Sequence, residues 1–156
     1  MTDARIRSPV SQAMRRLDEL PWPPRSAARE IVQAIAELDS GLGRFPTDTE
    51  IAARMGISRT ELDERLGEIR RAFAWFPPRT AGSRRPREHE DAAATERIGE
   101  AIARLPEREK LLVTLFYFEE LSLLEVAEVL GVPSSRASKS HVSALLRLKS
   151  RLLPED

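Results

Sequence analysis

The sequence contains no cysteine and only two histidines, His89 and His141, which lie far apart in the chain. The absence of cysteine excludes disulfides and thiolate metal ligands. Two distant histidines without a carboxylate cluster beside them give no metal-binding motif. No apolar run reaches about 18 residues, so we expect no membrane-spanning helix, and the N-terminus shows no signal-peptide pattern. These absences favour a cytoplasmic protein without a metal, a cofactor or a membrane partner.

The features of an enzyme active site are also missing. The sequence has no glycine-rich phosphate loop and no placed nucleophile–base pair, and its scattered Asp and Glu residues fit helix caps and solvated faces. We therefore expect that the protein is not an enzyme. Strand signals are nearly absent, while Ala, Leu, Glu and Arg dominate, and this composition predicts an all-α chain. The length of 156 residues allows one domain or two small ones.

The most clearly organised stretch is Leu121–Leu153. Ser122 followed by Glu125 is a capping box, which starts a helix by satisfying backbone N–H groups that have no partner within the helix. An apolar face follows at helical spacing, and Gly131 stands where the end of that helix needs a positive φ. A second helix is expected from about Ser134. Helix, tight turn and helix form the helix-turn-helix pattern, whose second helix enters the DNA major groove.

Positive charge is concentrated on this second helix, in a chain whose net charge is zero. Residues 134–151 contain five basic side chains and no acidic one, whereas residues 96–130 contain eight acids and four bases. This distribution favours contact with DNA phosphates. The alternative is a solvated basic helix end, since Lys and Arg also suit the C-terminal end of a helix.

If the helix enters the groove, the residues at its N-terminal end read the bases. The candidates for base contact are Ser134, Ser135, Arg136, Ser138 and Lys139. Arg136 or Lys139 could pair with guanine, and each good bidentate pair gives about 1–3 kcal/mol of discrimination. The basic residues further along the helix are expected to touch phosphates only; they are Arg147, Lys149 and Arg151. We expect His141 to be a packed or phosphate-bound histidine rather than a catalyst.

The same order of residues occurs earlier in the chain. Thr47 with Glu50 forms another capping box, and Gly56 follows at the matching position. The run Glu50-Ile51-Ala52 aligns with Glu125-Val126-Ala127. The chain therefore carries two helix-turn-helix units in tandem, and this duplication is a stronger signal than either copy alone.

The first unit differs from the second in charge. Residues 30–68 hold nine acids and four bases, and the acids on its second helix would repel a phosphate backbone. We therefore interpret the first unit as structural or protein-binding.

A segment with prolines, blocks of charge and few apolar residues spans residues 77–95. Such a segment cannot bury enough surface to order itself. We expect it to be a flexible linker between two small helical domains, residues 1–76 and 96–156, which move independently unless a partner clamps them. The alternative is that it threads a partner's channel.

These residues carry a family resemblance. The stretch LPEREKLLVTLFYFEELSLLEVAEVLGVPSSRASKSHV closely resembles the last conserved domain of the bacterial sigma-70 family. The stretch before the linker resembles the preceding domain of that family, and it is most similar to the flagellar and sporulation branch. The runs that carry this second resemblance are Arg5-Ile6-Arg7, Trp22–Ser26 and Leu42–Ala52. Together the two stretches cover nearly the whole chain.

In that family the last domain recognises the promoter −35 element and holds the flap-tip helix of the RNA polymerase β subunit. The resemblance therefore implies a sigma factor that directs transcription initiation, with promoter DNA and core RNA polymerase as partners. The residues that it implies for contact with the β flap are Leu112, Leu115, Phe116 and Phe118. Together with Leu111 they are too many for one narrow apolar stripe, although a four-helix core could absorb most of them.

Some features depart from the family pattern. The domain that precedes Arg5 in the family has no counterpart here, so we expect either a piece of a longer factor or a natural truncated relative, unable to open a promoter alone. Ala137 and Ser140 stand where the family usually has larger apolar residues, and Val142 and Leu146 fall on the face expected to meet solvent. These departures favour a second hypothesis: an interaction protein of sigma-factor descent that holds polymerase or an anti-sigma factor without specific DNA binding.

Overall fold

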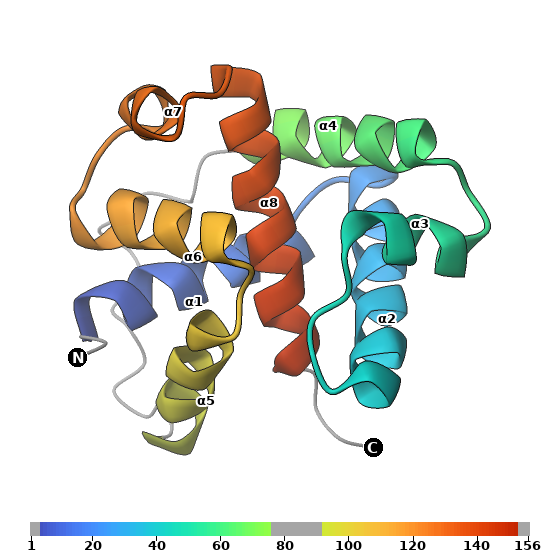
Figure 1. Cartoon of the computed structure of the whole chain (residues 1–156), viewed down its shortest axis with the longest axis horizontal. Helices are drawn as coiled ribbons and strands as arrows, with labels where there is room; N and C mark the ends of the chain where they lie inside the picture. Colours follow the sequence, from blue (N-terminus) through green and yellow to red (C-terminus); the bar gives the residue numbers. More distant parts are fainter. Residues whose placement is uncertain (1–3, 76–91, 153–156) are drawn as a thin grey trace.

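The structure, a computed structural model, describes residues 4–75 and 92–152, and every regular element in these two segments is a helix (Figure 1). This confirms the all-α fold predicted from the sequence. The N-terminal unit consists of α1 (Ala4–Asp18), α2 (Pro24–Leu42), α3 (Asp48–Met55) and α4 (Arg59–Trp75). The C-terminal unit consists of α5 (Ala92–Ala103), α6 (Glu107–Val113), the π-helical turn η1 (Thr114–Phe118), α7 (Leu123–Leu130) and α8 (Ser134–Arg151).

Both predicted helix-turn-helix units are present, and the first helix of each begins with the predicted capping box. The side chain of Thr47 accepts a hydrogen bond from the Glu50 N–H, while the Glu50 carboxylate accepts one from the Thr47 N–H. Ser122 and Glu125 make the same reciprocal pair at the start of α7. After α3 and α7 the chain turns at a glycine with a φ of 72° and 69°, respectively. A left-handed residue at this place ends a helix and redirects the chain.

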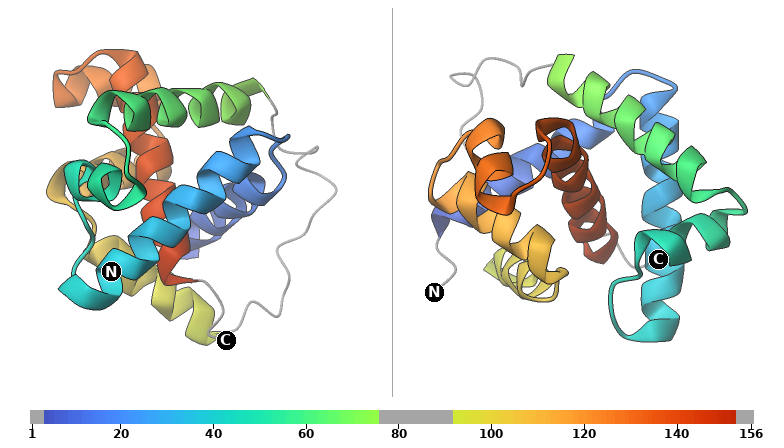
Figure 2. Two further views of the ribbon diagram at one scale, coloured as in Figure 1. Left: turned by 90° about the vertical axis from the view of Figure 1, so that its right-hand side faces the viewer. Right: turned by 45° about the horizontal axis from the view of Figure 1, so that its top comes forward.

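Helix α8 runs through the middle of the molecule (Figures 1 and 2). It packs against α1, α2 and α4 of the N-terminal unit and against α5, α6 and α7 of its own unit. Leu145, Leu146 and Leu148 are completely buried, so α8 contributes to the core that both units share. The two units are in contact through α8, and burying this shared apolar surface favours their contact.

The predicted linker falls largely on residues that the structure does not describe, namely 77–91. Residues 92–95 belong to α5, which begins at Ala92, so the helix starts earlier than expected.

Val142 and Leu146 were expected on a solvent-facing side of α8, but they are 1% and 0% exposed. They share a face with Lys139, because residues three or four apart in a helix lie on the same side. Lys139 bonds to Asp63 of α4. The expectation was therefore wrong, since this face of α8 is covered by the N-terminal unit and not by water.

No helix in residues 4–75 and 92–152 has the combination of length and apolar character that a membrane crossing requires.

Candidate nucleic-acid interface

The first turn of α8 is the exposed part of the predicted interface. Ser134, Ser135 and Arg136 are exposed. Ser138 is half-buried, and its hydroxyl donates to the carbonyl of Ser134 at 3.0 Å. Within the described residues the Arg136 guanidinium has no hydrogen-bond or ion-pair partner. Four of the five candidates for base contact therefore lie at the accessible start of the helix, and Arg136 is available to a ligand.

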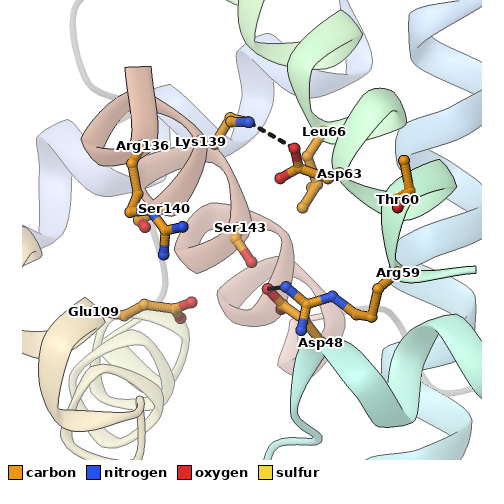
Figure 3. A pocket seen from close by; sticks show the side chains of 10 residues that line it. All are labelled: Asp48, Arg59, Thr60, Asp63, Leu66, Glu109, Arg136, Lys139, Ser140 and Ser143. Carbon is orange, nitrogen blue, oxygen red and sulfur yellow. Dashed lines mark hydrogen bonds and ion pairs between the residues drawn. The ribbon is translucent and has the colours of Figure 1, made fainter. Parts of the chain in front are cut away.

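Lys139, the fifth candidate, is already paired. Its ammonium lies 2.8 Å from the carboxylate of Asp63 on α4. Figure 3 shows both residues at a pocket between α8 and the first helix-turn-helix unit. Asp48 and Glu109 line the same pocket, so the basic face of α8 here meets carboxylates.

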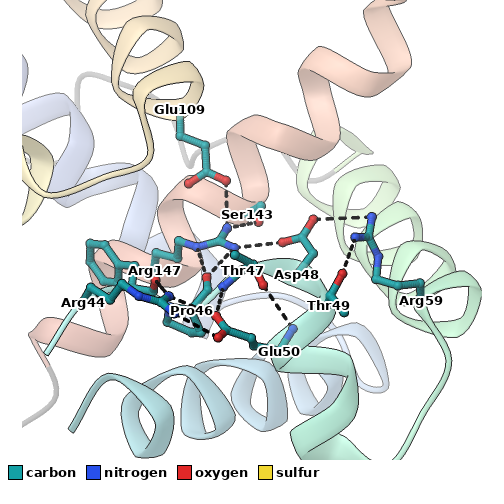
Figure 4. Close-up of polar contacts among 11 residues, drawn as sticks. Arg44, Pro46, Thr47, Asp48, Thr49, Glu50, Arg59, Glu109, Ser143 and Arg147 are labelled. Carbon is teal, nitrogen blue, oxygen red and sulfur yellow. Dashed lines mark hydrogen bonds and ion pairs between the residues drawn. The ribbon is translucent and has the colours of Figure 1, made fainter. Parts of the chain in front are cut away.

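Arg147 was expected to touch phosphate, but it is only 2% exposed and cannot reach one in this arrangement. Its guanidinium donates to the carbonyl oxygen of Pro46 at 2.9 and 3.2 Å and to Ser143 Oγ at 2.5 Å (Figure 4). It also donates to Asp48 at 2.8 Å and to Glu109 at 2.7 Å. The guanidinium thus connects α8 to the start of α3 and to α6. These contacts compensate its charge, which would otherwise be costly to bury.

The last two basic residues of α8 also have partners in the N-terminal unit. Lys149 Nζ lies 2.7 Å from the carboxylate of Asp18 at the end of α1. The guanidinium of Arg151 lies 2.6 Å from Asp39 on α2, and it lies 4.6 Å from the ring centre of Phe45. Both residues were expected to touch phosphates, and in this structure aspartates take that place.

Glu109 is a residue of this site that the sequence did not reveal. Burial raises its pKa to about 7, although the neighbouring Arg147 guanidinium acts in the opposite direction. An acid in the first turn of a helix is normally explained by its interaction with the helix dipole. For this reason nothing in the sequence indicated that Glu109 pairs with a buried arginine. Only the position of Arg147, far along the chain, identifies Glu109 as part of a buried ionic cluster.

His141 is packed, which is one of the two roles expected for it. It is buried between Phe73, Phe116 and Tyr117, and its Nε2 lies 2.6 Å from the Tyr117 hydroxyl. Burial lowers its pKa to about 4. A neutral imidazole can accept a hydrogen bond from the tyrosine hydroxyl, so His141 joins α8 to α4 and η1 without carrying charge.

The residues implied for polymerase contact are not all accessible. Leu112 is 0% exposed and belongs to the core, whereas Leu115 and Phe116 are half-buried and Phe118 is exposed. Leu112 therefore cannot contact a partner in this structure. Among the described residues of the C-terminal unit, the other large apolar side chains that are exposed are Leu111, Leu124 and Val129.

The fold defines a protein with two helix-turn-helix units, and this motif is one that binds DNA through its second helix. Two family models match the chain: "Sigma-70 region 3" over residues 26–74 and "Sigma-70, region 4" over residues 101–150. They coincide with most of the N-terminal and C-terminal units, respectively.

The sequence is also similar to curated relatives. It is 37% identical to the RNA polymerase sigma factor FliA of Escherichia coli (strain K12), over 95% of this chain and 68% of that protein. It is 33% identical to the protein of the same name from Pseudomonas aeruginosa, over 95% of this chain and 66% of that protein. The chain belongs to the sigma-70 family.

Two solved structures are similar in sequence. One is the cocrystal structure of the flagellar sigma/anti-sigma complex Sigma-28/FlgM, at 33% identity over 86% of this chain and 63% of that chain, with a TM-score of 0.41. The other is a Sigma-28(FliA)/FlgM complex, at 33% identity over 88% of this chain and 64% of that chain, with a TM-score of 0.42. The chain therefore spans somewhat less than two thirds of these solved sigma chains.

Proposed function

We propose that this chain directs transcription initiation as the promoter-binding part of an RNA polymerase sigma factor, with α8 recognising the promoter −35 element. One observation carries the proposal. The helix-turn-helix of the matched region 4 presents Arg136, exposed and without a partner in the described residues, at the N-terminal end of its second helix. That end of the helix contacts base edges in helix-turn-helix proteins. Arginine is also the side chain best suited to guanine.

We further propose that the chain consists of two domains joined by a linker. Residues 1–76 form a region 3-like domain, residues 77–95 a linker and residues 96–156 a region 4-like DNA-binding domain. The region matches at residues 26–74 and 101–150 support this division. Core RNA polymerase is the proposed protein partner, in the cytoplasm. The relatives are named as RNA polymerase sigma factors, and we propose no catalytic activity and no cofactor for this chain.

The proposed contact with the polymerase β flap uses the exposed side of α6 and η1. Phe118 is accessible there, with Leu115 and Phe116 beside it in the same turn, and Leu111 takes the place that the sequence had assigned to Leu112. A cluster of exposed apolar side chains on one face is typical of a protein-binding surface. An anti-sigma factor stays a predicted partner.

A second function is favoured by a specific observation. Lys139, Arg147 and Lys149 all have carboxylate partners within the chain, which leaves few free cations on α8 for DNA. A chain in this arrangement could serve as an interaction protein that binds polymerase or an anti-sigma factor without reading a sequence.

The test is enrichment of bound sequences from a random duplex pool at about 150 mM salt, where non-specific phosphate attraction is partly suppressed. It uses the full chain, alone and with core polymerase. We expect a defined motif to be enriched and Arg136→Ala to relax it. The loss of one bidentate contact corresponds to about 1–3 kcal/mol at one base pair. Glu61→Ala is the matched control, because Glu61 holds the equivalent place in α4.

Unchanged preference in Arg136→Ala would overturn the assignment of Arg136 as a base contact. The absence of any motif, with and without polymerase, would overturn the promoter proposal and favour the interaction protein.

A further inference from the structure

A pocket of about 340 Å³ lies between α8, α6 and the first helix-turn-helix unit (Figure 3). Its size falls within the range of small-molecule sites, about 300–1,000 Å³. Glu109 of α6 borders it, Arg136 and Ser140 of α8 lie beside it, and α4 contributes Leu66. Most side chains of the lining are charged or polar, so the pocket suits a small charged molecule rather than an apolar one.

The carboxylate of Glu109 has unused capacity for hydrogen bonds. Its Oε2 accepts from Arg147 at 2.7 Å, whereas Oε1 is buried and has no hydrogen-bond partner in the part of the chain that the structure describes. Arg147 also lies 2.8 Å from Asp48, so one buried guanidinium faces two carboxylates. Burial raises the pKa of Glu109 to about 7 even with Arg147 beside it, as is typical of a carboxylate whose charge is incompletely compensated. An ammonium group on a ligand would supply a hydrogen-bond donor and a positive charge here.

Arg136 has the opposite deficit. Its guanidinium has no hydrogen-bond or ion-pair partner in the described residues. The other two basic side chains of the lining do have partners, because Lys139 lies 2.8 Å from Asp63 and Arg59 lies 3.9 Å from Asp48. A carboxylate accepts two parallel hydrogen bonds from a guanidinium, so Arg136 is suited to a carboxylate group on a ligand.

The separation of these two groups limits the length of the ligand. Ser143, which like Glu109 is bonded to Arg147, lies two helical turns beyond Arg136, or about 10 Å along the axis of α8. The arginine side chain spans part of this distance. A ligand with both charges on one carbon is too short to reach both groups, whereas a chain of several methylenes can separate them and can also contact Leu66.

We propose that this pocket binds a small ω-amino acid, a zwitterion whose ammonium group contacts Glu109 and whose carboxylate contacts Arg136. The site shares Arg136 with the proposed DNA contact, but it requires neither DNA nor polymerase. The proposed function and this site can therefore fail separately, since one is tested with DNA and the other with small molecules alone.

The test is titration of the full chain with 6-aminohexanoate, measured by isothermal calorimetry at about pH 8, where the carboxylate of Glu109 is ionised. Hexanoate and hexylamine each carry one of the two charges, and glycine carries both on one carbon. We expect 6-aminohexanoate to bind at least about tenfold more tightly than each of these three, because a hydrogen bond to a charged group contributes that much to affinity. Absence of binding, or equal affinity for hexanoate or hexylamine, would overturn the proposal.

Two variants assign the two charges. Arg136→Ala changes an exposed side chain, and we expect it to lower the affinity for 6-aminohexanoate about tenfold and to leave that for hexylamine unchanged. Glu109→Gln keeps the shape of the side chain and should also weaken 6-aminohexanoate, with the affinity for hexanoate unchanged. The matched control is Arg108→Ala, because Arg108 is an exposed arginine of α6 outside the lining of the pocket. Equal affinities of Arg136→Ala and Arg108→Ala would overturn the proposal even if Glu109→Gln did not fold.

Discussion

The α3–α4 and α7–α8 units are built alike, position by position. Thr47 corresponds to Ser122, and Gly56 corresponds to Gly131. After α3 the glycine N–H donates to the carbonyl of Ala52, and after α7 it donates to that of Ala127. The next residue donates at 3.0 Å to the same carbonyl in both units. Buried positions also correspond, as with Leu62 and Ala137, Ile69 and Ala144, and Phe73 and Leu148.

Two aligned positions of the two second helices carry charges of opposite sign. Where α4 carries Glu61 and Glu64, α8 carries Arg136 and Lys139. The difference shows that caps and glycine turns specify the motif, while the charges on its second helix decide what it can bind. The contact between the two second helices uses a different acid, because Lys139 of α8 pairs with Asp63 of α4.

The largest expected effect concerns Arg147, whose counterpart in α4 is Ala72. Arg147→Ala would make the two helices alike at this position. It would leave Glu109, whose side chain is 12% exposed, without its cation, and half-buried Asp48 without the nearer of its two cations. We expect the free energy of unfolding to fall by about 3–5 kcal/mol, as measured when one member of a buried ion pair is removed. Urea unfolding checks this. Arg136→Ala, exposed on the same helix, is the control and should change stability by less than about 0.5 kcal/mol. Similar losses in the two variants would contradict the role given to the buried cluster.

The next comparison concerns pH. Glu109, with a pKa raised to about 7, keeps a proton in the folded chain that the unfolded chain has lost at pH above about 4.5. This makes stability fall as the pH rises from about 4.5 to 7. His141, with a pKa lowered to about 4, has lost a proton that the unfolded chain still holds below about pH 6.5. This makes stability rise with pH between about 4 and 6.5.

The two effects oppose each other, so the chain itself should vary little in stability between pH 4.5 and 6.5. In Glu109→Gln, the free energy of unfolding should rise with pH by up to about 1.4 kcal/mol per pH unit, the limit for one proton. In His141→Leu, stability should instead fall as the pH rises. Leucine is the residue at the aligned position of α4, Leu66. Thermal unfolding at several pH values measures both slopes, and equal slopes in the two variants would refute this balance.

The smallest expected effect tests how closely the two turns agree. A Cβ added at Gly56 or at Gly131 would meet no atom within 4 Å, so only the left-handed backbone opposes it. Gly56→Ala and Gly131→Ala should each lower the stability by about 1 kcal/mol, as measured by urea unfolding. Gly41→Ala is the control, because Gly41 lies inside α2 with equally open space around it. This change should stabilise by about 0.5–1 kcal/mol. Clearly unequal losses at the two turns would show that the units are not equivalent.

The local structure of both units could be predicted from the sequence because local signals determine it. Capping boxes, terminal glycines and the apolar spacing of α7 act over a few residues, and the structure has them as expected. The buried state of Arg147 could not be predicted, since arginine is mostly exposed and its partners near Pro46 and Asp48 are distant in the sequence. Periodicity likewise put Val142 and Leu146 on one face but could not say what covers that face.

The exposed and buried leucines of α6 could not be separated from the sequence. Leu112 was assigned to the polymerase-binding surface by family resemblance, but it is buried, whereas its neighbour Leu111 is exposed. Both precede the π-helical turn η1, which begins at Thr114, and the tertiary packing of α6 decides which of them is buried.

The position of α8 as the shared core also bears on how long the chain survives in a cell. Proteolysis often follows the equilibrium population of opened molecules, and an opened molecule would expose Val142 and Leu146 together. A ligand that covers this face would therefore protect the chain from degradation while it holds α8. We expect the chain's half-life after translation is stopped to be longer when such a ligand is present than when it is absent.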